Sequence, residues 1–172
     1  MIRKIVLIFV ASATALAGSS STTASGAPAS PCAAPQRHQF DFWLGNWRVV
    51  DASGAFQGTN NVTSEFDGCV VQEHWKGVEG GRGSSFNTYL PGRKLWQQTW
   101  VDAHGLTLLL LGGMQGSSMV LSGSRVAKNA SVIDRITWTP LPDGRVRQHW
   151  QEKSNDGKGW QEIFDGYYSK AR

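Results

Sequence analysis

The sequence lacks the local motifs that mark metal sites and activated serine nucleophiles. It contains two cysteines but no Cys-x-x-Cys pair, and no Gly-x-Ser-x-Gly sequence is present. Four histidines occur, each in a different segment and without the helical spacing of zinc ligands. We therefore predict no metal site and no cofactor, and motifs alone assign no catalytic residue.

Dense clusters of Lys and Arg are also missing. The whole chain carries a formal net charge of +4, but Arg3 and Lys4 belong to its first few residues. Without these two, 15 basic and 13 acidic residues are left. Proteins that bind nucleic acid usually carry a concentrated basic surface that neutralises phosphates. The sequence thus argues against a nucleic-acid partner.

The first 31 residues have the composition of an export signal followed by a linker. Basic residues precede an apolar run, and Ala15-Leu16-Ala17 fits a small-x-small cleavage site. The run ends too soon for a membrane-spanning helix, which needs about 20 apolar residues. We expect a signal peptide over 1–17, or up to about residue 26, a disordered linker over 18–31, and one domain over 32–172. The mature protein would then be periplasmic or secreted, without an integral membrane segment.

The two cysteines, Cys32 and Cys69, are expected to form a disulfide. An even pair in an exported domain favours this bond, because the compartment is oxidising. The bond would tie the start of the domain to a site 37 residues further on. Two free thiols are the alternative.

The rest of the chain consists of short alternating segments separated by turn sequences. Apolar and polar residues alternate with a period of two, and sequences such as Leu141-Pro142-Asp143-Gly144 interrupt them. This pattern predicts an all-β fold, an antiparallel up-and-down barrel of about ten strands, because closure removes exposed sheet edges. The expected strands are 46–51, 56–66, 69–77, 84–90, 94–102, 106–113, 118–125, 132–140, 145–153 and 160–169.

An aromatic stretch, FDFWLGNW at 40–47, leads into the first of these expected strands. We expect a short N-terminal helix over 36–44, whose rings Phe40, Phe42 and Trp43 lie across one end of the barrel. Gly45 would then release the chain into the first strand, where Trp47 would point inward.

The Gly45-Asn46-Trp47 triplet resembles the Gly-x-Trp signature of the lipocalin-like, or calycin, barrels. Ten strands resemble fatty-acid-binding and nitrobindin-type barrels more than true lipocalins. A longer pattern covers most of residues 36–169 and resembles a group of exported bacterial proteins of unknown function: FDFWLGNW, GCVVQEHW, LWQQTWVD, RITWTPLPDGRVRQHW and FDGYY. The resemblance implies a small soluble barrel and no assigned activity.

Two further expectations come from the resemblance. Calycins usually place a late Arg or Lys over the first-strand Trp, and Lys170 and Arg172 are the candidates here. Nitrobindin-like barrels bind haem through a late histidine. His149 is late, but the Arg-Gln-His-Trp sequence around it does not match a haem motif, so haem is disfavoured.

The strand faces that carry tryptophan supply the candidate site. Residues two apart share a strand face, and four expected strands mix large rings with carboxylates or amides on one face. This mixture suits a lumen that binds a ligand, because unpaired polar groups in a plain core are costly. Trp138 and Trp150 are expected to stack across a hairpin. The candidate ligand-binding residues are Glu73, Trp75, Gln98, Trp100, Trp138, Gln148 and Trp150.

Two other interpretations of these faces stay open. The polar groups could pair with Arg135, Arg147 or backbone near the strand ends in a purely structural role, or the rings could point outward as cross-strand pairs. A separate apolar run, Leu106–Leu111, is expected to be covered on its outer face by the N-terminal aromatic stretch, with a dimer interface as the alternative.

The sequence therefore predicts a monomer or weak homodimer that binds a small, partly apolar ligand in its lumen. One alternative is an enzyme that uses Glu73, Asp102 or His149 as acid–base groups. Another is an envelope structural or interaction protein with a filled barrel. The fold class alone does not separate these functions.

Overall fold

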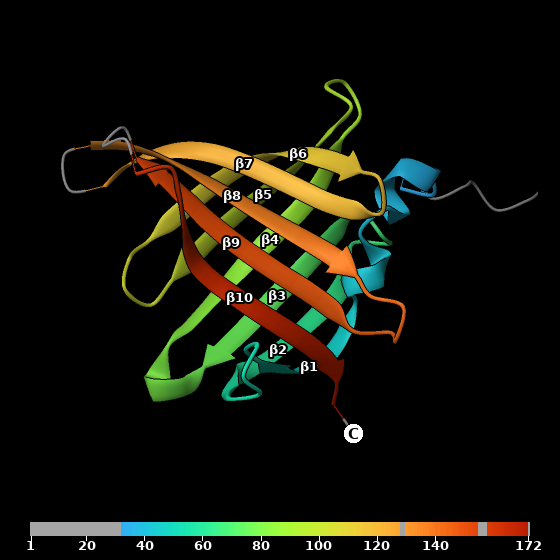
Figure 1. Cartoon of the computed structure of the whole chain (residues 1–172). Coiled ribbons are helices and arrows are strands. Elements are labelled where there is room, and N and C mark those ends of the chain that lie inside the picture. The colour runs from blue at the N-terminus through green and yellow to red at the C-terminus, as the bar shows by residue number, and fades with distance from the viewer. Residues whose placement is uncertain (1–31, 128–129, 155–157, 172) are drawn as a thin grey trace, which may run out of the picture.

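The computed structural model describes residues 32–127, 130–154 and 158–171 (Figure 1). The signal peptide and linker expected over 1–31 lie outside these described residues, and so does Arg172.

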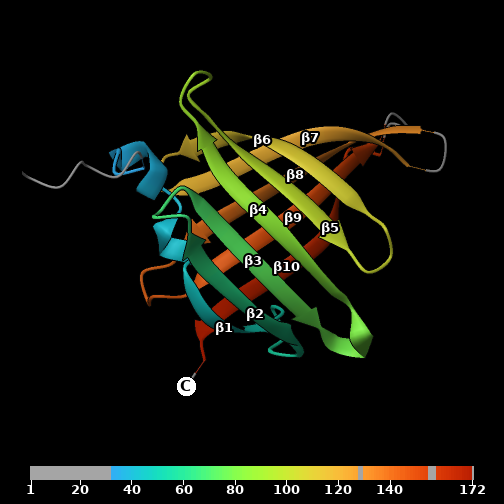
Figure 2. The ribbon, with the colours of Figure 1, turned by 180° about the vertical axis from the view of Figure 1, so that it is seen from behind.

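The described chain forms a closed antiparallel barrel of ten strands, which confirms the predicted all-β architecture. Each strand pairs with its neighbour in the sequence, and β1 pairs with β10 to close the sheet (Figures 1 and 2). Every strand begins and ends within two residues of its expected bounds. The strands are β1 (Gly45–Val50), β2 (Phe56–Glu65), β3 (Val70–Gly77), β4 (Arg82–Leu90), β5 (Leu95–Asp102), β6 (Thr107–Gln115), β7 (Ser118–Ala127), β8 (Ala130–Pro140), β9 (Val146–Ser154) and β10 (Trp160–Lys170).

The segment before β1 forms two short 3-10 helices in place of the single helix expected over 36–44. They are η1 (Pro35–His38) and η2 (Asp41–Trp43), and η3 (Val78–Gly80) connects β3 to β4. Leu44 is already extended, so no longer helix fits before β1. Within the described part of the chain, no helix is long and apolar enough to cross a membrane.

Rings from this segment close one end of the barrel, as expected. Phe40 and Trp43 are fully buried, with ring centroids 5.0 Å apart. The Phe40 centroid also lies 5.7 Å from that of Trp96 and 5.1 Å from that of Trp138. Trp47 is buried on β1 and donates its Nε1–H to the Trp43 carbonyl oxygen at 2.8 Å. We call Phe40, Trp43, Trp96 and Trp138 the aromatic plug, and the opposite end of the barrel the distal end.

A disulfide links Cys32 to Cys69, which confirms the predicted pairing. It fastens residues 32–44, the stretch before β1 that carries Phe40 and Trp43, which we call the plug segment. The two Cα atoms are 5.0 Å apart. The bond joins the chain just before η1 to the turn between β2 and β3. It therefore holds the plug segment against the rim of the barrel.

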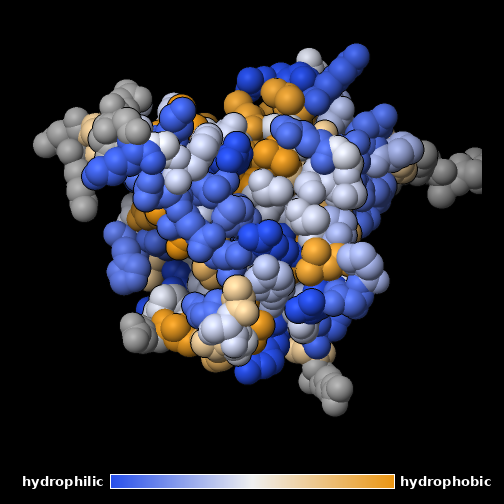
Figure 3. All heavy atoms as spheres, viewed as in Figure 1, coloured by the Kyte–Doolittle hydropathy of each residue, from blue (hydrophilic) through white to orange (hydrophobic). Residues whose placement is uncertain are grey.

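The outer face of β6 is not covered by the aromatic stretch, so that expectation is wrong. Leu108 and Leu110 point into the barrel, but Leu109 is 56% exposed, with Phe86 and Val101 also exposed on nearby strands. Phe40 and Trp43 of that stretch pack instead into the interior at one end of the barrel. The side formed by β7 to β10 is mostly hydrophilic, with hydrophobic residues in small separate groups (Figure 3).

Candidate functional site

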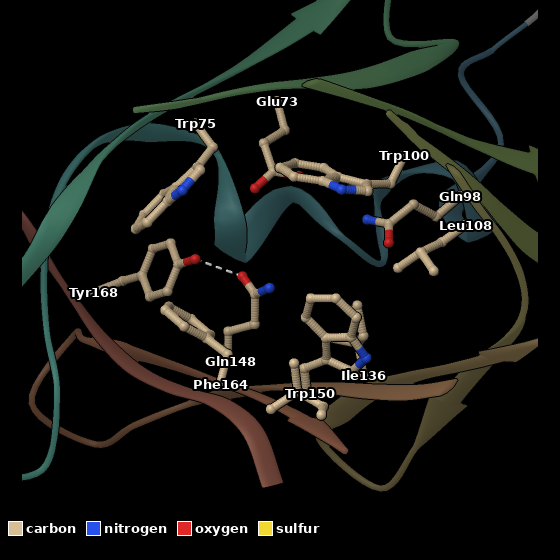
Figure 4. Close-up of a pocket in the computed structure, with 11 residues that line it drawn as sticks. Glu73, Trp75, Gln98, Trp100, Leu108, Ile136, Gln148, Trp150, Phe164 and Tyr168 are labelled. Atoms are coloured by element: carbon tan, nitrogen blue, oxygen red, sulfur yellow. Dashed lines mark hydrogen bonds between the residues drawn. The ribbon is translucent and has the colours of Figure 1, made fainter. Parts of the chain in front are cut away.

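A cavity of about 180 Å³ lies inside the barrel, toward the distal end. Trp75 and Trp100 mark this position, because each lies two residues before the distal end of its strand, β3 or β5. Figure 4 shows the lining side chains pointing toward one another from opposite walls. The lining residues are Glu73, Trp75, Gln98, Trp100, Leu108, Ile136, Gln148, Trp150, Ile163, Phe164 and Tyr168.

Three tryptophans form walls of the cavity, and glycines make room for two of them. Trp75, Trp100 and Trp150 come from β3, β5 and β9. A Cβ atom at Gly83 would collide with the Trp100 ring, and one at Gly77 would lie 2.9 Å from Trp75 Nε1. Glycine within or at the end of a strand often marks such a close approach. These glycines therefore help to fix where the rings can lie.

A β-bulge in β10 shapes the rim of the cavity. The register between β10 and β9 shifts between Glu162 and Phe164, which leaves Ile163 as the extra residue. Ile163 lines the cavity and is still 46% exposed, so the cavity reaches solvent beside it. Phe164 also lines the cavity, and its ring meets Trp75 edge to face, with centroids 5.8 Å apart.

Glu73 is the centre of a buried hydrogen-bond cluster on one wall. Asn60 Nδ2 donates to Glu73 Oε1, and Ser85 Oγ donates to Glu73 Oε2, both at 2.7 Å. Asn87 Nδ2 donates to Ser85 Oγ at 3.0 Å, and Gln98 Nε2 donates to Asn87 Oδ1 at 2.9 Å. The cluster thus crosses four strands, from β2 to β5, and all five of its residues are buried.

The electrostatic environment of Glu73 is unusual, because its carboxyl is only 3% exposed and has neutral partners. Among the described residues that line the cavity, none is Lys, Arg or His. Burial raises the pKa of Glu73 to about 7, although the hydrogen bonds from Ser85 and Asn60 act in the opposite direction. Glu73 can therefore gain or lose a proton near neutral pH.

Asp134, on the β8 wall, is buried in a different way. It is 1% exposed, and Arg125 Nε donates to its Oδ2 at 2.7 Å. Trp150 Nε1 donates to Asp134 Oδ1 at 2.8 Å, which orients that indole at the cavity. Arg125 also pairs with Glu152. The charge of Asp134 is thus compensated within the barrel.

Tyr168 supplies a hydrogen-bonding hydroxyl on β10. Its hydroxyl donates to Gln148 Oε1 at 2.5 Å, a bond that is drawn in Figure 4. Burial, and next the negative charge of Glu73, raise the pKa of Tyr168 well above its ordinary value, against a smaller opposing effect of Asn60. Tyr168 therefore stays protonated at physiological pH.

The structure brings six of the seven candidate residues together around the cavity: Glu73, Trp75, Gln98, Trp100, Gln148 and Trp150. Trp138 lies instead in the aromatic plug, with its ring centroid 5.3 Å from that of Trp43. Across the β8–β9 hairpin, Trp138 pairs with Gln148, whereas Trp150 pairs with Ile136. The two tryptophans therefore lie at different depths along the barrel axis. Trp138 contacts Phe40 and Trp43 of the plug, so the expected stack of Trp138 on Trp150 is wrong.

The structure shows neither the expected pairing of the polar groups with Arg135 or Arg147 nor an outward arrangement of the rings. Arg135 Nη2 donates to Gln151 Oε1 at 2.7 Å, and Arg147 Nε donates to Asp165 Oδ1 at 2.7 Å. These partners lie on the outer face of the sheet, so neither arginine compensates Glu73. The tryptophans around the cavity point inward, which excludes the outward arrangement of their rings.

Of the three acid–base candidates, Glu73 alone lines the cavity in the described structure. Asp102 Oδ1 accepts two backbone N–H groups of the β5–β6 turn, both at 2.9 Å. His149 faces outward, and its Nε2 lies 3.1 Å from Glu162 Oε2. The cavity thus offers aromatic surface, hydrogen-bonding side chains and one carboxyl, on Glu73, that can take up a proton.

Five lining residues were absent from the sequence-based set: Leu108, Ile136, Ile163, Phe164 and Tyr168. The period-two pattern offered a signal for most of them, because Ile136 shares a face with Trp138, and Phe164 with Tyr168. Ile163 had no such signal, since a bulge breaks the alternation there.

Comparisons with known proteins add no family. No protein-family model matches the chain, and no curated protein matches it. In the described part of the chain, no three His, Cys, Asp or Glu side chains converge on a point that could hold a metal ion. The function is therefore argued from the geometry of the cavity.

Proposed function

We propose that this protein binds a small, partly apolar ligand in the cavity of its barrel. One observation carries the proposal: aromatic walls and a few buried polar groups converge on the same cavity. This combination is typical of small-molecule sites, in which apolar surface provides affinity and polar groups fix orientation.

The volume limits the size of the ligand. A protein cavity of about 150 Å³ lined by apolar side chains can hold benzene. The present cavity, at about 180 Å³, has room for one ring with a short substituent. A longer ligand would extend past Ile163, where the cavity reaches solvent.

The binding function is better supported than the two alternatives. For acid–base catalysis, Glu73 is the one candidate group among the described residues that line the cavity. The raised pKa of Tyr168 makes its hydroxyl a poor proton donor or acceptor at neutral pH. A filled structural barrel would leave no cavity of this size.

We further propose a lipocalin-like barrel that functions outside the cytoplasm, in the periplasm or after secretion. Lys170 Nζ lies 3.7 Å from the centroid of the Trp47 ring and donates to the Leu44 carbonyl oxygen, which supports the resemblance to calycins. The Cys32–Cys69 disulfide supports an oxidising compartment.

Two matched variants test the binding function. Trp150→Leu removes a ring from the cavity, and Trp160→Leu makes the same change on the outer face, where Arg135 covers the ring. With benzyl alcohol as the probe, we expect titration calorimetry to show wild-type affinity in Trp160→Leu and affinity weaker by about fivefold in Trp150→Leu. Equal affinity in both folded variants would contradict the proposed site.

A further inference from the structure

We propose that the ligand of this cavity is a small organic cation, in which an ammonium group is attached to an apolar ring. The ammonium group would lie against Glu73, and the ring would lie between Trp100 and Trp150. This inference rests on the proposed binding function and names the chemical class of its ligand.

The carboxyl of Glu73 carries the first argument, because it is buried at the cavity without a counter-ion. In the described structure its oxygens accept hydrogen bonds from the neutral groups Asn60 and Ser85, and no basic side chain lines the cavity. Buried charges in proteins are normally paired. Asp134 follows this rule in the same barrel, through its ion pair with Arg125. A bound ammonium group would supply the positively charged partner that the Glu73 carboxylate lacks.

The aromatic walls carry the second argument. The face of an indole ring is electronegative, and it attracts a cation within about 6 Å of its centroid. Figure 4 shows the carboxyl of Glu73 between the rings of Trp75 and Trp100. Because Glu73, Trp75 and Trp100 line the same cavity, a cation bonded to this carboxyl would share that space with both rings. Aromatic walls around an acidic group are a known way to bind substituted ammonium groups.

The same electrostatics disfavour an anionic ligand. Such a ligand would meet the Glu73 carboxylate and would find no basic side chain among the described lining residues. A neutral ligand lacks this repulsion but leaves the buried carboxylate unpaired. The test is therefore the ratio of the affinities for a cationic and a neutral ligand of the same size.

Two ring compounds of nearly equal size test the role of charge. At about pH 8 benzylamine is protonated, whereas benzyl alcohol is neutral. We expect titration calorimetry to show that the wild type binds benzylamine at least about tenfold more tightly than benzyl alcohol. Glu73→Gln should bind the two compounds equally. Glu162→Gln, which removes a carboxylate beside His149 on the outer face, is the matched control and should keep the preference.

A pH series provides a second test that needs the wild type alone. Phenyltrimethylammonium carries a charge at every pH. Its affinity should be constant above the pKa of Glu73, about 7, and should fall by at least about tenfold in total as the pH drops below it, until it reaches the affinity of the protein with protonated Glu73, because protonation removes the negative charge. Among the other described residues that face the interior, Tyr168 stays protonated, and Asp134 and Glu152 form ion pairs with Arg125.

The outcomes separate this inference from the function on which it rests. If benzylamine and benzyl alcohol bind the wild type equally, or if phenyltrimethylammonium binds equally at about pH 8 and pH 5, the ligand class is wrong while the binding function stands. If neither ring compound binds the wild type, the proposed binding function fails, and the inference fails with it. The pH series decides the matter even if Glu73→Gln does not fold.

Discussion

Glu73 is held in the barrel wall by hydrogen bonds in place of an opposite charge. Two neutral donors satisfy its oxygens, and the cluster continues through Asn87 to Gln98. Such a network fixes the direction of the carboxyl, but it compensates an ionised carboxylate less than a cation would. The residue is thus positioned for function at some expense of stability when it is charged.

Replacing Glu73 by Gln should change how the stability of the protein depends on pH. Burial raises the pKa of Glu73 from its ordinary value of 4.5 to about 7, so the folded state holds this proton more tightly than the unfolded state. The stabilising effect of the proton is complete below about pH 4.5 and is lost as the pH rises through 7. In urea denaturation, we expect the free energy of unfolding of the wild type to fall by about 3 kcal/mol over this interval, relative to Glu73→Gln.

The variant keeps the hydrogen bonds that make this comparison fair. A glutamine side chain can accept from Asn60 and donate to Ser85, because a hydroxyl both donates and accepts. The control is Glu162→Gln, whose carboxylate is largely exposed and should leave the pH dependence of the wild type unchanged. A wild type and a Glu73→Gln variant with parallel stability curves would show that the carboxyl keeps an ordinary pKa in the folded protein.

At the scale of elements, the strands could be predicted because each one carries its own signal. The period of two reports which side chains face inward, and turn sequences such as Leu141-Pro142-Asp143-Gly144 report where strands end. The plug segment had no comparable signal. Its two 3-10 helices are too short for a regular pattern, and their form depends on how Phe40 and Trp43 pack against rings from distant strands.

The candidate site could be predicted in part, for a physical reason. Alternation places Trp138 and Trp150 on the same side of the sheet, but it does not give their depth along the barrel. Depth depends on strand register and on the competing rings of the plug, which hold Trp138. The bulge at Ile163 likewise depends on the pairing of two strands, which a single strand sequence does not specify.

Removing one ring of the aromatic plug should destabilise the whole barrel. Phe40 is fully buried and contacts three other aromatic rings of the plug, so Phe40→Ala leaves a cavity that rigid neighbours cannot fill. We expect a loss of about 3–5 kcal/mol in the free energy of unfolding, measured by chemical denaturation. Phe42→Ala is the control, because Phe42 is partly exposed and should lose less. Equal losses for the two variants would mean that the plug does not close the core.

At the scale of the whole molecule, the two ends of the barrel differ in what holds them. At the plug end, aromatic packing, the Cys32–Cys69 disulfide and the contact of Lys170 with Trp47 join the N-terminal segment to the sheet. Toward the distal end, glycines and a bulge leave the cavity between the walls. A rigid plug end would hold the strands in place, so that the walls of the cavity are preorganised for a ligand.

This division predicts that loss of the disulfide lowers stability without altering the cavity. The bond closes a loop across 37 residues, for which the chain-entropy account gives a stabilisation of about 4 kcal/mol. We expect the double variant Cys32→Ser/Cys69→Ser to lose about this amount in chemical denaturation, and to bind benzyl alcohol with the affinity of the wild type under conditions where it is folded. The serine pair avoids a free thiol, and reduction of the wild type with dithiothreitol should reproduce the loss. A folded double variant with markedly weaker binding would show that the disulfide also positions the cavity walls, and that the two ends of the barrel act as one unit.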